Sequence, residues 1–196
     1  MNKAFFTLAD KILELDVFDG VYEPSEDSFL LAKNIPTKLS GTRVLEIGSG
    51  SGVISLIAAK NGADVTAVDI EDTAVENTKH NADKHKVKIK VMKSNLFENV
   101  IDSYDLIIFN PPYVPCNKEG LCGETAWVGG KDGREYIDKF LKDFKNHLKS
   151  KGKSLMIISS KNKIDDELKK QGWKERDFSL YFFEKLSVME YINNAD

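Results

Sequence analysis

Residues 110–113 read NPPY and follow directly on an apolar run, residues 104–109. The two prolines fix φ and lack N–H donors, so this segment predicts a stiff, extended turn whose carbonyl oxygens have no local hydrogen-bond partner. Asn110 adds an amide oxygen, and Tyr113 adds a flat ring for stacking. Such acceptors can hold the N–H bonds of a planar nitrogen while its lone pair faces an electrophile. The segment therefore indicates chemistry on a planar substrate nitrogen that carries hydrogens.

A glycine-rich turn, residues 46–52 (EIGSGSG), lies between an expected strand and an expected helix. Such a turn lets the backbone approach a ligand where a Cβ atom would clash. Its Gly-x-Gly-x-Gly spacing differs from the Gly-x-Gly-x-x-Gly fingerprint of dinucleotide-binding proteins. Asp69 ends the next strand, where it can accept hydrogen bonds from ribose hydroxyls. The pattern favours a cofactor site over a tight turn without a ligand.

The charge of Glu46 indicates which cofactor binds. A carboxylate at the end of the first expected strand would repel a pyrophosphate group, but it suits a cationic ligand. S-adenosylmethionine (SAM) carries an ammonium and a sulfonium group and has no phosphate. Electrostatics therefore favour SAM over a nicotinamide dinucleotide, and the expected reaction is a methyl transfer.

The elements that must position these residues follow an alternating pattern. Strands are expected at residues 43–47, 63–68, 87–92, 104–109 and 154–158, and helices at 53–61, 73–85, 136–148 and 164–171. Residues 173–191 are expected to form two strands joined as a hairpin. The alternation predicts an α/β fold with a doubly wound, mostly parallel sheet covered on both faces. In such folds the ligand lies at the carboxyl ends of the strands.

The N-terminal part of the chain precedes this pattern. Ser25 is expected to cap a helix whose first turn carries Glu26 and Asp27, because the helix dipole favours acidic residues there. We expect residues 1–40 to form an N-terminal extension and helix packed on the core. Residues 41–196 are expected to form the SAM-binding catalytic part of what is a single domain overall.

Composition excludes several classes of protein. The chain has 196 residues, 41% of them apolar and 30% charged, as ordinary globular domains do. No apolar run approaches the ~20 residues that span a bilayer and the N-terminus has no apolar signal-peptide core, so a cytoplasmic protein is expected. A net charge of -3 with three arginines argues against a nucleic-acid-binding protein. Cys116 and Cys122 have neither Cys-x-x-Cys nor zinc-ligand spacing, so free thiols and no metal site are expected.

Five segments carry a resemblance to a known family. They are residues 21–31 (VYEPSEDSFLL), 45–53 (LEIGSGSGV), 105–115 (DLIIFNPPYVP), 126–141 (AWVGGKDGREYIDKFL) and 184–188 (EKLSV). The chain resembles the HemK-like release-factor glutamine methyltransferases, class I SAM-dependent enzymes, in their archaeal and eukaryotic branch. The resemblance implies a doubly wound, Rossmann-like sheet of seven strands with a C-terminal antiparallel hairpin. It also implies methyl transfer to the glutamine amide in the Gly-Gly-Gln motif of a translation release factor.

The resemblance also implies roles for individual residues. Asn110 would grip the substrate amide with help from the backbone of Pro111 and Pro112, and Tyr113 would pack on the amide and the cofactor. The residues expected to hold SAM are Ser28, Glu46, Gly48, Gly50, Asp69, Ile70, Asn95, Leu96 and Asn110, with Asn95 and Leu96 beside the adenine. Asn95 stands where the family usually has Asp, so weaker SAM binding is expected. A small zinc-binding activator subunit, adding a strand near residues 87–92, is a further implied partner.

Three other functions remain open from the sequence. The NPPY segment also suits a methyltransferase that acts on an exocyclic amine of adenine or guanine in a flipped base. A protein lysine is another conceivable acceptor. A SAM-fold scaffold without catalysis is the non-enzyme alternative, although such a scaffold has no need for Glu46, Asp69 and Asn110. SAM affinity separates the scaffold from the enzymes, and salt-sensitive binding to DNA or RNA identifies a nucleic-acid enzyme.

Overall fold

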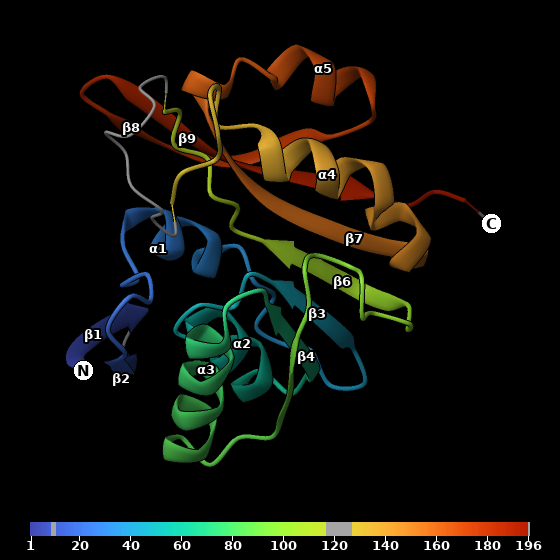
Figure 1. Ribbon diagram of the computed structural model, residues 1–196. Coiled ribbons are helices and arrows are strands. Elements are labelled where there is room, and N and C mark those ends of the chain that lie inside the picture. Colours follow the sequence, from blue (N-terminus) through green and yellow to red (C-terminus); the bar gives the residue numbers. More distant parts are fainter. Residues whose placement is uncertain (9–10, 117–126, 196) are drawn as a thin grey trace.

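The computed structural model describes residues 1–8, 11–116 and 127–195, and it contains a seven-stranded sheet. The strands are β3 (Arg43–Ile47), β4 (Asp64–Asp69), β5 (Ile89–Lys93), β6 (Tyr104–Phe109), β7 (Leu148–Ser159), β8 (Lys174–Tyr181) and β9 (Glu184–Ile192). Their order in the sheet is β5-β4-β3-β6-β7-β9-β8 (Figure 1). β9 pairs antiparallel with β7 and β8, whereas the other pairs are parallel. The expected mostly parallel sheet with a C-terminal antiparallel hairpin is confirmed.

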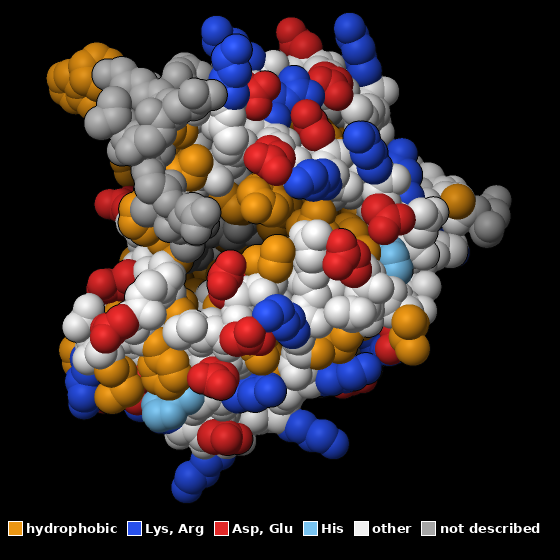
Figure 2. Space-filling view, viewed as in Figure 1, with side chains coloured by type: hydrophobic (Ala, Val, Ile, Leu, Met, Phe, Trp, Pro, Cys, Tyr) orange, Lys and Arg blue, Asp and Glu red, His pale blue; other side chains and the backbone are white. Residues whose placement is uncertain are grey.

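Helices cover both faces of the sheet (Figure 1). One face carries α1 (Glu26–Lys33), α2 (Val53–Lys60) and α3 (Asp72–Lys84). The other carries α4 (Glu135–Asp143), the 3-10 turn η1 (Phe144–His147) and α5 (Asp165–Lys170). Within the described ranges, no helix is long and apolar enough to cross a membrane. Acidic and basic side chains are interspersed over the face of the molecule shown in Figure 2.

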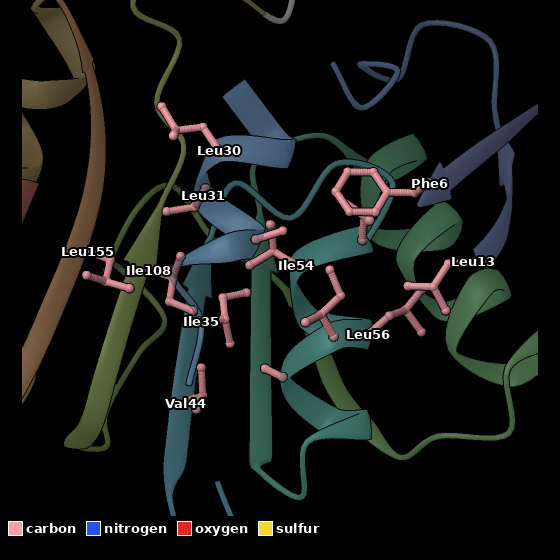
Figure 3. Close-up of a cluster of buried hydrophobic side chains, with 14 of the residues drawn as sticks. Phe6, Leu13, Leu30, Leu31, Ile35, Val44, Ile54, Leu56, Ile108 and Leu155 are labelled. Carbon is pink, nitrogen blue, oxygen red and sulfur yellow. The ribbon is translucent and has the colours of Figure 1, made fainter. Parts of the chain in front are cut away.

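Alternate residues of the central strands supply two separate cores, as the period of a β-strand requires. The first core, shown in part in Figure 3, lies under α1 and α2 and takes Val44, Ile108 and Leu155 from the strands. The second core takes Leu45, Ile107 and Met156 and lies under α4 and α5. Both faces of the sheet are therefore buried, which explains why its central strands are almost continuously apolar.

An N-terminal hairpin, formed by β1 (Asn2–Leu8) and β2 (Lys11–Val17), was not among the expected elements. Its two strands pair antiparallel, with Ala4 opposite Leu15. Phe6 is buried and stacks on Phe29 of α1, with ring centroids 4.0 Å apart and an interplanar angle of 3°. The hairpin is thus joined to the first core (Figure 3).

The helix expected over residues 136–148 is shorter than predicted. α4 ends at Asp143, η1 follows, and Leu148 is already the first residue of β7, where it pairs with Tyr104. The apolar spacing was interpreted as one helix because Ile137, Phe140 and Leu148 are all buried in the same core. Leu148 is buried because it pairs with Tyr104 in the sheet, not because it lies on the apolar face of a helix.

The expected cap of α1 is also wrong in its chemistry. Ser25 occupies the N-cap position, but its side chain makes no cap hydrogen bond and instead contacts the Glu26 carboxylate. The carboxylate of Asp27 accepts the backbone N–H of Ser28 at 2.5 Å. Asp27 is buried, so it belongs to the interior of the protein rather than to the exposed first turn.

Candidate active site

A cavity of about 830 Å³ opens at the carboxyl ends of β3, β4 and β6. All the residues expected to hold SAM line it: Ser28, Glu46, Gly48, Gly50, Asp69, Ile70, Asn95, Leu96 and Asn110. Pro112 lines it as well, whereas Pro111 and Tyr113 do not. Pro111 is buried and Tyr113 is half-buried behind the cavity wall. The structure therefore brings the glycine turn and the NPPY segment to one cavity, as the strand order requires.

The glycine turn after β3 is folded against the end of β4. The backbone N–H groups of Gly48 and Ser49 both donate to the carbonyl oxygen of Val68, at 2.8 and 3.1 Å. Gly48 and Gly50 have φ angles of 68° and 51°, in the left-handed region that favours glycine. A Cβ atom on Gly52 would lie 3.0 Å from Thr78 Cγ2. The spacing of the glycines thus follows from local backbone geometry and from close packing on α3.

Glu46 places a carboxylate at the base of the cavity. Its side chain is buried, and Oε2 accepts the backbone N–H of Ser55 at 2.9 Å together with the Ser55 hydroxyl. Burial, partly opposed by the hydrogen bonds from Ser55 and assisted by the nearby Asp69 carboxylate, raises the pKa of Glu46 to about 8. A cationic ligand would stabilise the charged form of this carboxyl group.

Asp69 adds a second carboxylate to the cavity. Burial raises its pKa, whereas hydrogen bonds from the backbone N–H groups of Gly50 at 2.9 Å and Glu71 at 3.1 Å lower it. The charged residues that line the described part of the cavity are Asp19, Glu46, Asp69, Glu71 and Glu135, and none of them is basic. The cavity is therefore suited to a cationic ligand that carries hydroxyl donors, and SAM fits this description.

Asn95 and Leu96 line the cavity beyond Asp69. Asn95 Nδ2 donates to Glu98 Oε1 at 2.7 Å, so the amide oxygen is the atom left for a ligand. Leu96 has a φ of 49°, a left-handed conformation that is uncommon for a leucine. Ile70 is 43% exposed and offers an apolar surface to the same part of the cavity. A planar, amine-bearing ring is compatible with these groups.

The Asn110 side chain is oriented by a residue that is distant in sequence. Asn110 Nδ2 donates to Asp27 Oδ2 at 3.1 Å, and the two residues are 83 positions apart. Because the amide nitrogen faces the carboxylate, the amide oxygen faces away from it. Asn110 Oδ1 is buried and has no hydrogen-bond partner in the part of the chain that the structure describes. An unsatisfied buried acceptor costs about 1–3 kcal/mol, so this oxygen is a ready site for an external N–H donor.

Asp27 also holds two tyrosine hydroxyls. Tyr113 donates to Asp27 Oδ2 at 3.2 Å, and Tyr22 donates to Oδ1 at 3.1 Å. Burial, followed by the Asp27 charge, raises the pKa of both tyrosines above the ordinary value, so each is a neutral hydrogen-bond donor. Asp27 thus fixes the amide of Asn110 and the ring of Tyr113 together.

The backbone of the NPPY segment is held by residues 127–133. Val114 pairs with Val128 in a parallel bridge, and its N–H donates to the Trp127 carbonyl at 3.0 Å. A Cβ atom on Gly129 would lie 2.1 Å from the Pro112 carbonyl oxygen, and one on Gly133 would lie 2.0 Å from that of Tyr113. No side chain fits at either position, so these glycines let two main chains come into contact.

Two residues of this arrangement are not apparent from the local sequence. Asp27 fits the acidic first turn of a helix, although it also lies within the segment 21–31 that carries the family resemblance. Asn162 was not singled out, and nothing in its local sequence marks it. Its buried amide donates to the Tyr113 carbonyl at 2.8 Å and to the carbonyl oxygens of Asp132 and Gly133, both at 3.2 Å. Both residues act on the NPPY segment from distant parts of the chain.

The expectation of free thiols is wrong for Cys116, which is disulfide-bonded. Spacing along the chain does not specify whether a cysteine forms a disulfide. Cys122 lies outside the described residues.

Comparisons with known proteins identify the family of this chain. Residues 22–173 match the family described as Methyltransferase small domain. A protein of Methanocaldococcus jannaschii named "Putative protein N5-glutamine methyltransferase" is 41% identical over 83% of this chain and 85% of its own. Methyltransferase HEMK2 of Homo sapiens is 35% identical over 78% of each chain. The Release factor glutamine methyltransferase of Aquifex aeolicus is 36% identical over 83% of this chain and 64% of its own.

Solved structures support the fold. The T. thermophilus 16S rRNA N2 G1207 methyltransferase RsmC, in complex with AdoMet and guanosine, is 16% identical and superposes with a TM-score of 0.76, covering 98% of this chain and 50% of that one. A methyltransferase from Pyrococcus furiosus is 20% identical, with a TM-score of 0.71 over 93% of this chain and 90% of that one. The resemblance found in the sequence motifs is confirmed, and the chain belongs to the Methyltransferase small domain family, within its group of HemK-like methyltransferases.

Proposed function

We propose that this protein transfers a methyl group from SAM to the side-chain amide nitrogen of the glutamine in the Gly-Gly-Gln motif of a translation release factor. The observation that carries the proposal is the buried, unpartnered oxygen of Asn110 in the cavity wall. An oxygen in this state accepts an N–H bond, and a primary amide offers two. Relatives named release factor glutamine methyltransferases support the same acceptor.

SAM is the methyl donor, and it supplies an electrophilic methyl group on a sulfonium centre. Glu46 would meet the cationic part of this ligand, and Asp69 would accept hydrogen bonds from its ribose hydroxyls, since both line the cavity. Asn95 and Leu96 would lie beside the adenine, while Ser28, Ile70 and the backbone of the glycine turn would complete the site. Support comes from the acidic lining of the cavity and from the AdoMet bound to the structural relative RsmC.

The side chains around Asn110 address the chemical difficulty of the reaction. An amide nitrogen is a poor nucleophile, because its lone pair is delocalised into the carbonyl group. Asn110 Oδ1 and a proline carbonyl accept its two N–H bonds, which turns the lone pair toward the methyl group. Tyr113, fixed by Asp27, supports this geometry from behind the cavity wall. The new nitrogen–carbon bond forms as the sulfur–carbon bond breaks, and the nitrogen releases one proton to solvent.

The charges around the cavity favour a protein acceptor over a nucleic acid. All charged residues among the described cavity lining are acidic, which repels phosphate groups. Acidic and basic side chains alternate over the surface in Figure 2 without a basic patch on that face. An exocyclic base amine would satisfy the same acceptors, and it stays the alternative substrate because the fold is shared with an rRNA methyltransferase.

The test is transfer of tritiated methyl from SAM to the cognate release factor, with a Gln→Ala version of its Gly-Gly-Gln motif as the control acceptor. Label on the wild-type factor alone supports glutamine methylation. Equal label on both factors points to another side chain, such as lysine. Label only on added RNA or DNA, declining with salt, would identify the nucleic-acid alternative. Loss of labelling in Asn110→Ala links the reaction to the unpartnered oxygen.

A small zinc-binding activator subunit is a further part of the proposal. Support comes from β5, which is the edge strand of the sheet and pairs with β4 alone among the described strands. An added strand could continue the sheet there. Co-expression with the host's small zinc-binding candidate, followed by light scattering of the purified sample, tests the complex. If the purified enzyme stays monomeric and is fully active when the zinc-binding protein is present, the proposal of an activator subunit is contradicted.

A further inference from the structure

Three buried polar side chains lie on one face of α3. Asn77, Thr78 and Asn81 each have an exposed fraction of 0%. Burying an amide destabilises the folded state unless its donors and its acceptor are hydrogen-bonded. The hydrogen-bond partners of these three residues therefore indicate the structural role of this face of α3. The partners lie in two places, the end of the N-terminal hairpin and the glycine turn.

The two asparagines hold the end of β2. Asn77 Oδ1 accepts the N–H of Phe18 at 2.8 Å, and Asn77 Nδ2 donates to the Asp16 carbonyl at 2.7 Å. Asn81 Oδ1 accepts the N–H of Asp16 at 3.0 Å, and Asn81 Nδ2 donates to the same carbonyl at 2.8 Å. The two amides thus bond the last residues of the hairpin much as a neighbouring strand would.

Asn81 and Thr78 also hold the glycine turn. Asn81 Nδ2 donates to the Ser51 carbonyl at 2.9 Å, so its two hydrogens join the hairpin to the turn. Thr78 Oγ1 lies 2.9 Å from Ser49 Oγ and 3.0 Å from the Gly50 carbonyl oxygen. Among the described residues, the side chain of Asn77 bonds only to Asp16 and Phe18 and not to the turn.

The hairpin decides which way the Asn81 amide points. Because the Asp16 N–H needs an acceptor, Asn81 Oδ1 faces that N–H, while Nδ2 gives one hydrogen to the Asp16 carbonyl and the other to the Ser51 carbonyl. The chain that leaves β2 then lines the cavity through Asp19, Gly20 and Tyr22. One buried amide therefore connects two walls of the cavity, although it is not itself among the lining residues.

We propose that Asn81 is a positioning residue for the methyl donor, oriented by the N-terminal hairpin and acting through the glycine turn. The donor is SAM under the function proposed above, so the inference rests on that proposal. Loss of the bond to Ser51 frees the turn to sample conformations that do not hold the donor. Binding and hairpin docking are then linked, and each stabilises the other by the same factor.

Direct calorimetric titration with SAM tests the inference without any acceptor. Asn81→Ala is expected to raise the Kd for SAM by about 10-fold, as the loss of one or two buried hydrogen bonds does. The matched control Asn77→Ala removes hairpin contacts alone and is expected to change that Kd by less than about 3-fold. Thr78→Val removes contacts to the turn alone and replaces Asn81→Ala if that variant does not fold. Equal Kd values for wild type and Asn81→Ala would overturn the proposal, whereas a wild type that fails to bind SAM would overturn the proposed function instead.

Amide hydrogen exchange supplies a second readout. The Asp16 N–H donates to Asn81 Oδ1 and reports on the link directly. Saturating SAM is expected to slow its exchange by about 10-fold in the wild type, and by more than it slows exchange in the buried part of β7, residues 154–158, which serves as the reference for global stabilisation. In Asn81→Ala the excess protection should vanish. Equal protection of Asp16 and of β7 in the wild type would leave the hairpin with no part in donor binding and contradict the inference.

Discussion

The glycine turn and the NPPY segment follow neighbouring strands of one sheet, but they are held in different ways. The turn is fixed by its own backbone conformation and by contacts with β4 and α3, in which the hydrogen-bonded side chains lie 19 to 30 residues from their partners. The NPPY segment is rigid in itself, yet the positions of its side chains and backbone are set by Asp27 and Asn162, which lie 83 and 49 residues from their partners. The donor side of the cavity is therefore built from contacts that are closer in the sequence, and the acceptor side from more distant ones.

Their electrostatics differ as well. The donor side carries two buried carboxyl groups whose pKa values are raised, and neither has a basic partner among the described cavity-lining residues. The acceptor side presents a neutral oxygen, with the carboxylate of Asp27 placed behind it. The proposed cationic donor would therefore meet the carboxyl groups of Glu46 and Asp69 directly. The proposed neutral acceptor would meet the amide oxygen of Asn110, whose amide nitrogen bonds to the carboxylate of Asp27. Substitutions on the two sides should therefore affect different steps.

The largest expected effect is that of Asn110→Ala. Removing the unpartnered Oδ1 of Asn110 should lower kcat by about 10²–10³-fold, as removal of a single group that holds the transition state does elsewhere. The Kd for SAM should change far less. Single-turnover methyl transfer with saturating SAM measures the first quantity, and calorimetry measures the second. Near-normal turnover would end the assignment of Asn110.

Asp27→Asn should have the next largest effect. The substitution keeps the shape of the side chain but lets the Asn110 amide turn over, so its oxygen no longer faces the cavity in every molecule. We expect kcat to fall by about 10–100-fold, the range found for groups that orient a functional residue. Glu26→Gln, in the same helical turn but exposed, is the control and should leave kcat unchanged. Equal losses in both variants would indicate a general charge effect instead.

Glu46→Gln tests the donor side, where the expected result is weaker binding and a more stable empty protein. Burial raises the pKa of Glu46 to about 8, so the folded state holds a proton that the unfolded chain releases at lower pH. The stability of the empty wild type should therefore fall as pH rises from about 4.5 to 8. The variant lacks this loss, and its Tm without SAM should exceed that of the wild type by several degrees at pH 8 but not at pH 5. The Kd for SAM should rise about 10-fold, and a variant that binds SAM normally would contradict the role of Glu46.

The smallest expected effect is that of Tyr113→Phe. The ring and its packing remain, and only the 3.2 Å bond to Asp27 is lost. A loss of about 2–5-fold in kcat is expected, because the substitution removes a single hydrogen bond to Asp27 and Tyr113 does not line the cavity. Steady-state kinetics with saturating SAM measures it. A loss as large as that of Asn110→Ala would mean that the hydroxyl contacts the acceptor directly.

The same contrast explains what the sequence could predict. The strands β3, β4 and β6, the glycine turn and the NPPY segment were all predicted, because each is specified by residues next to it in the chain. The hairpin β1–β2 was missed, because the exposed apolar residues Phe5 and Ile12 lie next to its buried apolar positions and hide the period of two. The roles of Asp27 and Asn162 depend on contacts between distant segments, and no local pattern contains them.

The ends of helices and strands also depend on contacts between distant segments. The run of apolar positions from Ile137 to Leu148 is compatible with one long helix, and only the pairing of Leu148 with Tyr104 divides it. The disulfide at Cys116 is likewise a property of how a loop folds, which spacing does not encode.

The unpartnered oxygen of Asn110 also bears on what happens after the reaction. The product amide carries a methyl group and a single hydrogen on its nitrogen. It cannot satisfy Asn110 Oδ1 and a proline carbonyl together, so the product should bind more weakly than the substrate by about 1–3 kcal/mol. Release is thereby favoured, and a second methylation of the same glutamine is disfavoured. In the proposed reaction, the unpartnered oxygen of Asn110 would thus limit each glutamine to one methyl group.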